Sequence, residues 1–555
     1  MQAEIIESIG AGHDTLALMP TGGGKSLCFQ VPAMAKEGLC LVVTPLIALM
    51  KDQVEHLRER DILAEAIYTG LTYREIQTIL DNCQFGNRKF LYVSPERLES
   101  QEFLKRLVQL PVCMIAVDEA HCISQWGYDF RPSYLKIAQI RKALPEVPVL
   151  ALTATATPDV VDDIQDRLAF KTRNVLQKSF ERPNLHYVVR KTDDKPKQLL
   201  HILSRVPGSA IVYVRNRQKT KDIAELLIDA GVSTTYYHAG LRNQEKDQRQ
   251  QEWRSGEKRV MVATNAFGMG IDKADVRLVI HMDLPDTLEA YFQEAGRAGR
   301  DEKEAYAVLL YNATDKTKAR KRVADNYPDR DFIKKVYEAV GNWLEVGIGS
   351  GLDHTFVFPF EQFCIERKLP FLPTLSAILL LQQAGFLTYQ EETETQPRVM
   401  LLQQRDELYN LPLSEEQDRV LSYLLRTYTG IFANPVYIND NQMADRLSIS
   451  PKHVNEILVS LAQEHIIQYI PRRKTPYIGY PLERQELQFV VIPDKIYENR
   501  RKLYISKLQA MVEYAEQEQF CRSQLLLAYF GENDAHPCGQ CDVCLRHKRE
   551  NDSDT

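Results

Sequence analysis

Long apolar runs are absent from this sequence, and none reaches the ~18 residues that a membrane helix needs. The first residues, MQAEIIESIGAGHD, have neither the basic start nor the apolar stretch of a secretory signal. Glycine and proline number 26 each in 555 residues, too few for a collagen-like or low-complexity chain. Ten cysteines in this length do not make a secreted disulfide scaffold, so we expect a reduced, cytoplasmic protein without a membrane segment.

An excess of positive charge is also lacking. Lysine and arginine number 69 against 75 aspartates and glutamates, which gives a net charge of −6. Any contact with nucleic acid must therefore use local basic patches. The hydrophobic share of 44% is ordinary for a globular protein, and at about 150 residues per domain the chain predicts three to five domains.

Two series of short apolar runs alternate with amphipathic helical stretches. The first extends from Leu16 to about Thr155 and the second from Ala210 to Tyr311. Runs of this spacing, rich in Val, Ile, Leu and Ala, are typical of buried parallel strands in an α/β sheet. We therefore predict two tandem α/β domains, over residues 1–175 and 176–325.

The region after residue 325 has a different sequence pattern. Residues 360–389 and 441–470 each predict a short helix, a turn, a longer helix and an apolar β-like end. This is the layout of a winged helix, which we place at 326–410 and 411–495. A pair of small helical bundles that bind no ligand is the alternative.

A glycine-rich motif, MPTGGGKS, occupies Met19 to Ser26 between an apolar strand and an apolar helical stretch. Its glycines let backbone N–H groups surround a phosphate, and the helix N-terminus adds positive potential. We assign phosphate binding to the loop, with Lys25 reaching the β- and γ-phosphates and Ser26 holding Mg²⁺. The strict pattern has glycine where Met19 stands, and a ligand-free strand–helix turn is the alternative. The other loop residues assigned to the nucleotide are Thr21, Gly22, Gly23 and Gly24.

Two further motifs supply the charges that nucleotide hydrolysis needs. In IAVDEAH (115–121), Asp118 would bind Mg²⁺ and Glu119 would orient or deprotonate the attacking water. In QEAGRAGR (293–300), Arg297 and Arg300 would reach the γ-phosphate from the second domain. The alternatives are two solvated carboxylates and a basic surface turn.

Four cysteines near the end of the chain have the spacing C-x16-C-x2-C-x2-C. Thiolates so spaced suit a tetrahedral structural Zn²⁺, and a redox C-x2-C pair is the alternative. We predict a zinc module over 496–549 and a disordered tail over 550–555. The predicted ligands are Cys521, Cys538, Cys541 and Cys544.

Taken in order, these motifs resemble those of superfamily-two helicases, and the subfamily that they resemble is the RecQ DNA helicases. The segments that carry the resemblance are 41–54, 92–98, 118–134, 152–157, 180–187, 237–241, 262–272, 291–302 and 500–549. The resemblance implies that both α/β domains are RecA-like. It also implies an ATP-driven DNA helicase that moves 3′→5′, acts in recombination and repair, and uses ATP, Mg²⁺ and Zn²⁺. It also implies binding to single-stranded DNA and duplex junctions, and it leaves protein partners unknown.

The resemblance also assigns DNA contacts and an adenine contact. The loop 122–134 resembles the aromatic-rich loop of the RecQ helicases, with Trp126, Phe130 and Arg131 as expected contacts. Stacking of bases on such rings tolerates any sequence, while packing of the rings in an interdomain core is the alternative. Gln2 is assigned to the adenine. The family has an aromatic residue upstream of this Gln, so an incomplete base site and a truncated start are both open.

The order of the last parts departs from the family, in which the zinc module follows the second α/β domain directly. We predict that residues ~326–495 are an insertion and that the zinc module still docks on the second α/β domain. The stretch 468–482 predicts a wing hairpin that presents Arg472, Arg473 and Lys474 to DNA phosphates.

Two other functions compete with a DNA helicase. An RNA helicase is disfavoured by the aromatic loop and the zinc module. A DNA-binding protein built on an inactive ATPase is disfavoured by the intact Lys25, Glu119 and Arg300.

Overall fold

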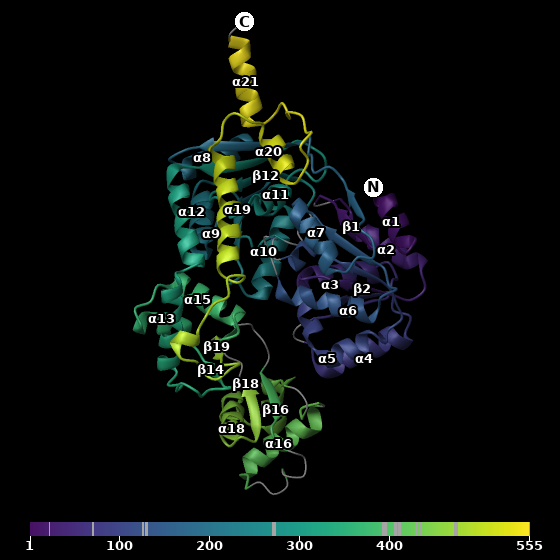
Figure 1. The fold of residues 1–555 in the computed structure, drawn as a ribbon, viewed down its shortest axis with the longest axis vertical. Helices are drawn as coiled ribbons and strands as arrows, with labels where there is room; N and C mark the ends of the chain where they lie inside the picture. The colour runs from purple at the N-terminus through teal and green to yellow at the C-terminus, as the bar shows by residue number, and fades with distance from the viewer. Residues whose placement is uncertain are drawn as a thin grey trace. The chain divides into compact units, whose positions relative to one another are not determined.

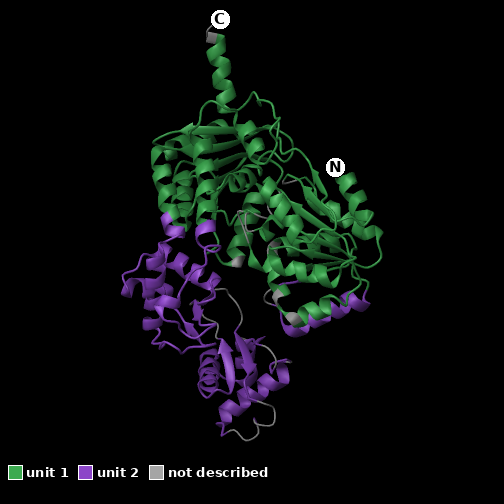
Figure 2. Cartoon of the chain, in the orientation of Figure 1, with its two compact units in different colours: residues 1–66, 87–323, 501–555 green, residues 67–86, 324–500 purple. Residues whose placement is uncertain are grey.

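The computed structural model of the chain forms two compact units, drawn in separate colours in Figure 2. The first unit comprises 1–66, 87–323 and 501–555, and the second comprises 67–86 and 324–500. The residues described are 1–20, 23–68, 71–124, 127, 131–268, 273–390, 397–403, 408, 412–428, 430–432, 435–470 and 476–553.

The first α/β domain is built on a seven-stranded sheet in the order β3-β4-β2-β5-β6-β1-β7. The pairings from β4 to β7 are parallel, as the apolar runs predict. All five residues of β2 are buried, because both faces of a parallel sheet are covered. The strands are β1 (Thr15–Leu18), β2 (Leu39–Val43), β3 (Ala64–Ile67), β4 (Phe90–Val93), β5 (Val112–Val117), β6 (Val149–Thr153) and β7 (Val175–Gln177). The helices are α1 (Gln2–Gly10), α2 (Lys25–Ala35), α3 (Ile47–Arg58), α5 (Gln101–Leu107), α6 (Ile137–Ala143) and α7 (Pro158–Arg167).

The second α/β domain has a six-stranded sheet in the order β10-β11-β9-β12-β13-β8, with every pairing parallel (Figure 1). The strands are β8 (Leu185–Lys191), β9 (Ser209–Tyr213), β10 (Thr234–Tyr237), β11 (Val260–Ala263), β12 (Val276–His281) and β13 (Ala305–Tyr311). The helices are α8 (Lys195–Arg205), α9 (Arg217–Asp229), α10 (Asn243–Ser255), α11 (Leu288–Ala295) and α12 (Ala313–Asn326). Two tandem parallel-sheet domains are thus confirmed.

The chain returns to the second α/β domain through α19 (Glu498–Glu516), α20 (Arg522–Tyr529) and α21 (Asp542–Ser553). Arg322, shortly before the exit, and Tyr504, shortly after the return, both donate to Oδ1 of Asp286, at 2.6 and 3.1 Å. The buried Nζ of Lys507 on α19 lies 2.7 Å from Oε1 of Glu289 on α11. The predicted insertion and the docking of the zinc module on the second α/β domain are confirmed.

The second unit holds two small antiparallel sheets, in the orders β14-β19-β15 and β17-β16-β18. The elements of the first are α13 (Arg330–Trp343), β14 (Thr355–Val357), α14 (Phe360–Glu366), α15 (Phe371–Gln383), β15 (Thr388–Gln390) and β19 (Tyr477–Gly479). Those of the second are β16 (Arg398–Leu401), α16 (Glu415–Thr427), β17 (Val436–Tyr437), α17 (Asp440–Leu447), α18 (Pro451–Gln463) and β18 (Ile467–Ile470). This unit also includes α4 (Tyr73–Phe85), whose Tyr73 packs against the core formed around α16 and α18.

The strand pairing corrects the hairpin expected over 468–482. β18 pairs with β16, whereas β19 pairs with β14 and β15, so the two strands belong to different sheets. The second small domain is therefore nested within the first. The boundary expected at 410/411 is also wrong, because β16, which precedes it, pairs with β17 and β18 of the second domain. The local sequence suggested a hairpin because the true partners of β19, at 355–357 and 388–390, lie far earlier in the chain.

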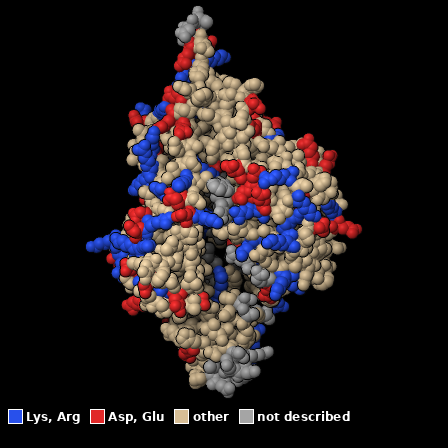
Figure 3. Space-filling model, in the orientation of Figure 1, with Lys and Arg blue, Asp and Glu red and all other residues tan. Residues whose placement is uncertain are grey.

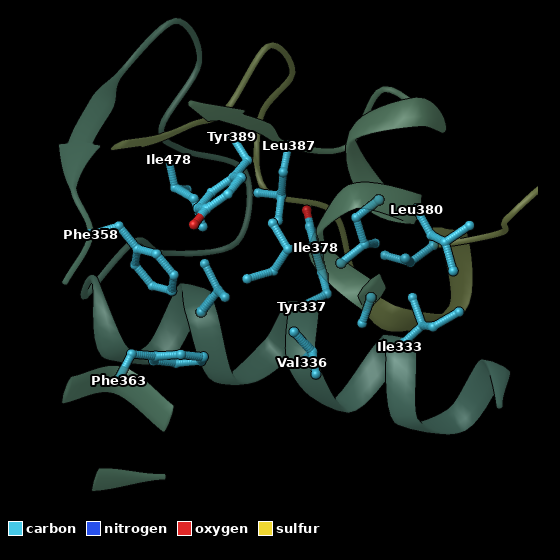
Figure 4. Close-up of a cluster of buried hydrophobic side chains, with 14 of the residues drawn as sticks. Ile333, Val336, Tyr337, Phe358, Phe363, Ile378, Leu380, Leu387, Tyr389 and Ile478 are labelled. Atoms are coloured by element: carbon cyan, nitrogen blue, oxygen red, sulfur yellow. The ribbon is translucent and has the colours of Figure 1, made fainter. Parts of the chain in front are cut away.

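The first small domain has an aromatic-rich core of its own (Figure 4). Ile333, Val336, Tyr337 and Val340 lie at i, i+3, i+4 and i+7 of α13 and are all buried. Ile478 of β19 packs into the same core, which explains why β19 joins this sheet. Among the described residues, no helix has both the length and the apolar character needed to cross a membrane.

Candidate active site and zinc site

The described part of the phosphate loop ends at the N-terminus of α2, which has no side-chain cap. Gly24 precedes α2 with a φ of +77°, and no side chain caps the helix, so its first N–H groups are available to an anion. The left-handed backbone at Gly24 is a conformation that favours glycine, and a Cβ there would also displace the Gln2 amide. The Gln2 amide donates to the carbonyl of Gly23 at 2.9 Å, so Gln2 lies at this loop. Thr21 and Gly22 lie outside the described residues.

The acidic pair follows β5, on the same sheet as the phosphate loop. Burial and the neighbouring charge of Glu119 raise the pKa of Asp118 to about 6. Burial opposes ionisation of Glu119 as well, but the charges of Lys25, His121, Arg297 and Arg131 together lower its pKa. Lys25 acts on both carboxylates, so the three groups lie together. Glu119 has a φ of +46°, a strained conformation for this residue type and one that occurs at functional sites.

A buried polar path continues from the acidic pair. His121 Nδ1 lies 3.4 Å from Oε2 of Glu119 and 2.9 Å from Oγ1 of Thr153. The Thr153 hydroxyl in turn donates to the carbonyl of Thr155 at 3.2 Å. The path connects Glu119 to the loop that follows β6.

The arginine loop, residues 296–300, follows α11 in the second α/β domain. Arg297 is 4% exposed and donates to the carbonyl of Gly268. Its charge lowers the pKa of Glu119, so it acts on the acidic pair of the first domain. The charges of two predicted site residues, Lys25 and Arg297, thus act on a third, Glu119.

The predicted DNA contacts are mostly outside the described residues, namely Trp126, Phe130, Arg472, Arg473 and Lys474. Arg131 is described, and its backbone N–H donates to the carbonyl of Cys122 at 2.9 Å. Its charge also lowers the pKa of Glu119, so it lies near the acidic pair.

The four cysteines converge around the starts of α20 and α21, with Cys544 in the first turn of α21. Their Sγ atoms all lie within 4.8 Å of one another, which suits four ligands around one tetrahedral Zn²⁺. Backbone N–H groups of Cys538 and Cys544 donate to the sulfurs of Cys521 and Cys541, at 3.3 and 3.4 Å. Hydrogen bonding among the thiols lowers the pKa of Cys521 and raises that of Cys538, while burial raises the pKa of Cys544. All four predicted ligands are brought together.

Sequence reasoning missed a basic cluster at the end of β10. His238 is buried, and burial together with the charges of Lys221, Arg217 and Arg249 lowers its pKa. The Arg249 guanidinium lies 3.9 Å from the centre of the Tyr236 ring. The motif around His238 was recognisable, but its basic neighbours come from α9 and α10.

On the face drawn in Figure 3, acidic and basic side chains intermingle.

Four family descriptions match successive parts of the chain. DEAD/DEAH box helicase matches residues 1–164, and the helicase conserved C-terminal domain matches 194–302. The RecQ helicase winged-helix domain of Bacteroidota matches 399–471, and RecQ zinc-binding matches 483–545. The chain belongs to the RecQ family of helicases.

Two curated RecQ relatives are similar to part of this chain. The ATP-dependent DNA helicase RecQ of Haemophilus influenzae is 41% identical over 347 residues, which are 62% of this chain and 56% of that one. Its namesake in Bacillus subtilis is 44% identical over 307 residues, 55% of this chain and 52% of that one. The match thus spans little more than half the length of these relatives. The solved DUF1998 helicase MrfA bound to DNA and AMPPNP is 19% identical, with a TM-score of 0.49 over 58% of this chain and 49% of that one.

Proposed function

We propose that this RecQ-family chain is an ATP-dependent DNA helicase that moves 3′→5′ on single-stranded DNA and opens duplex junctions in recombination and repair. The observation that carries the proposal is that the charges of Lys25, from the first α/β domain, and of Arg297, from the second, both act on the buried Glu119. Convergence of a phosphate-loop lysine, an acidic pair and an arginine across two domains is what hydrolysis coupled to domain closure requires. The relatives that bear the name ATP-dependent DNA helicase support the choice of DNA.

The residues that would hold the nucleotide fit its chemistry. The uncapped N-terminus of α2 offers backbone N–H groups to the phosphates, with Lys25 as the adjacent cation. Ser26 and Asp118 would hold Mg²⁺, which when bound neutralises phosphate charge. A cation there also favours the ionised form of Asp118, whose pKa burial and Glu119 otherwise raise.

Hydrolysis then depends on groups of both domains. Glu119, kept ionised by Lys25, His121 and Arg297 against its burial, orients the attacking water and accepts its proton. Arg297 and Arg300 stabilise the charge that develops on the γ-phosphate. Gln2, which already lies at the loop, is the proposed adenine contact.

The bound nucleotide is proposed to affect DNA binding through the segments after β5 and β6. His121 bridges Glu119 and Thr153, so a change at the γ-phosphate alters a path that reaches Thr155. Arg131 ends the aromatic loop and acts on Glu119, so DNA on that loop would act on the same carboxylate. Trp126 and Phe130 are proposed to stack on bases.

Zinc is proposed to have a structural role here. Cys521, Cys538, Cys541 and Cys544 would hold it in a closed set of four thiolates, which leaves no position for a substrate. Ten free cysteines suit a reducing compartment, which supports the cytoplasmic location.

The test is ATP turnover by the purified chain with no nucleic acid, with single-stranded DNA and with single-stranded RNA of the same sequence. We expect strong stimulation by DNA, weak stimulation by RNA, and no turnover in a Lys25→Ala control. Stimulation by RNA alone would favour the RNA helicase. Binding of DNA without turnover would favour an inactive ATPase.

A further inference from the structure

The segment that joins the two α/β domains, residues 178–184, contacts the arginine loop directly. Nη2 of Arg182 donates to the carbonyls of Ala298 and Gly299, at 2.9 and 2.8 Å. Its Nη1 donates to the carbonyl of Gly296 at 3.3 Å. One guanidinium thus binds three backbone carbonyls of the loop that presents Arg297 and Arg300.

A second side chain of the same segment fixes the end of the loop. Nδ2 of Asn184 donates to the carbonyls of Gly299 and Lys303, at 2.7 and 2.9 Å. Gly299 has a φ of +61°, and a Cβ there would lie 2.5 Å from the Asn184 amide nitrogen. The loop therefore has a tight conformation that glycine permits and the joining segment holds.

The zinc module also forms hydrogen bonds with the joining segment. The Glu532 carboxylate accepts hydrogen bonds from the backbone N–H of Phe180 and the hydroxyl of Ser179, both at 2.7 Å. Nε2 of Gln540 donates to the carbonyl of Pro183 at 2.7 Å. Arg182 lies between these anchored residues, so its position is set by the zinc module as well as by its own contacts.

Carbonyl binding by an arginine also serves purely structural purposes in this domain. Arg259 donates to the carbonyls of Leu203, Val206 and Gly208, at 2.6 to 2.9 Å, and the loop that it closes carries no predicted site residue. The two arginines share their bonding pattern and differ in the loop that they hold. Arg259 is therefore a matched control for Arg182.

We propose that Arg182 is a positioning residue for ATP hydrolysis, which holds the arginine loop so that Arg297 and Arg300 reach the γ-phosphate. The proposal rests on the proposed function, because it requires those two arginines to act on the nucleotide. In this proposal Arg182 does not act on the nucleotide directly. Its effect passes through the backbone carbonyls of residues 296, 298 and 299.

The test compares variants of the full-length chain in DNA-stimulated ATP turnover, ATP affinity and thermal unfolding. Arg182→Ala is expected to lower kcat about 10²-fold, because displacements of ~1 Å have that effect on catalytic groups. ATP affinity should change less than about twofold, since the phosphate loop is intact. Arg259→Ala should lower the melting temperature to a similar extent and leave kcat within about twofold.

Two further variants separate positioning from general damage. Arg182→Lys keeps the charge but cannot span the three carbonyls as a planar guanidinium does, so an intermediate kcat is expected. In the double variant Arg182→Ala/Arg300→Ala the two losses of kcat should combine to less than their product, because Arg182 acts in part through Arg300. If Arg182→Ala does not fold, the kcat of Arg182→Lys still tests the proposal.

Several results would overturn the proposal. They are an unchanged kcat in Arg182→Ala, an equal loss of kcat in Arg259→Ala, and additive losses in the double variant. A wild-type chain without DNA-stimulated turnover would overturn the proposed function and this proposal with it. An active wild type with any of the other three results would overturn this proposal alone.

Discussion

The ion pair between Lys507 on α19 and Glu289 on α11 gives a sharp prediction about the docking of the returning segment. Nζ and Oε1 are 2.7 Å apart, and the two side chains are 8% and 3% exposed. Lys507→Met keeps the apolar stem of the side chain and removes its charge. Glu289 then remains as a buried carboxylate, with the Tyr529 hydroxyl as a further hydrogen-bond partner.

The expected cost follows from burial. Removing one partner of a buried ion pair costs about 3–5 kcal/mol, because the remaining charge stays desolvated. For a cooperative unit of 150–250 residues, each kcal/mol lowers the melting temperature by roughly 2–4 °C. We therefore expect Lys507→Met to lower the melting temperature by about 6–20 °C.

Thermal unfolding, with hydrogen exchange of α11 and α19, checks this prediction. The matched control is Lys191→Met, which removes an ion pair to Glu518 whose side chains are 48% and 44% exposed. Such an exposed pair contributes about 0–1 kcal/mol, so the control should melt within a few degrees of the wild type. Adding Glu289→Leu to Lys507→Met should restore much of the loss. Equal melting temperatures for Lys507→Met and the control, with unchanged exchange in α19, would refute the reasoning.

The remaining predictions concern the sites. Lys25→Ala should abolish DNA-stimulated hydrolysis, measured as phosphate release, because the phosphates lose their cation; substantial turnover would contradict the assignment. Arg300→Ala should keep ATP affinity and lower kcat by at least ~10³, and normal turnover would remove Arg300 from the mechanism. Freshly purified protein should carry about one Zn²⁺ per chain, and Cys541→Ala should lose it and destabilise the zinc module more than the α/β domains; metal analysis that finds no zinc would disprove the site. Alanine at all of residues 472–474 should weaken binding to forked DNA and flatten its salt dependence by about one unit per lost phosphate contact; an unchanged affinity and slope would place the duplex contact elsewhere.

The sequence predicted what depends on short-range patterns. The apolar run 39–43 becomes the fully buried strand β2, because a parallel strand buried on both faces must be apolar throughout. The cysteine spacing predicted the zinc set, because three of its ligands lie within seven residues of one another. The phosphate loop and the acidic pair were equally local, since each follows its own apolar strand.

Long-range pairings escaped prediction. Residues 477–479 form the next apolar stretch after β18, yet they pair with Thr355–Val357, because the core around Ile478 and Tyr337 belongs to the first small domain. Nothing near Arg182 in the sequence shows that its guanidinium binds carbonyls more than a hundred residues later. The basic residues around His238 were hidden for the same reason, since they come from two different helices.

Strand separation tests the central claim most directly. The purified chain, with ATP and Mg²⁺, is given a short labelled duplex that carries a single-stranded tail on either the 3′ or the 5′ end. We predict ATP-dependent release of the labelled strand from the 3′-tailed duplex, little release from the 5′-tailed duplex, and none with a non-hydrolysable ATP analogue. Release that needs no hydrolysis, or no release from any tailed duplex despite ATP turnover, would contradict the assignment as a 3′→5′ DNA helicase.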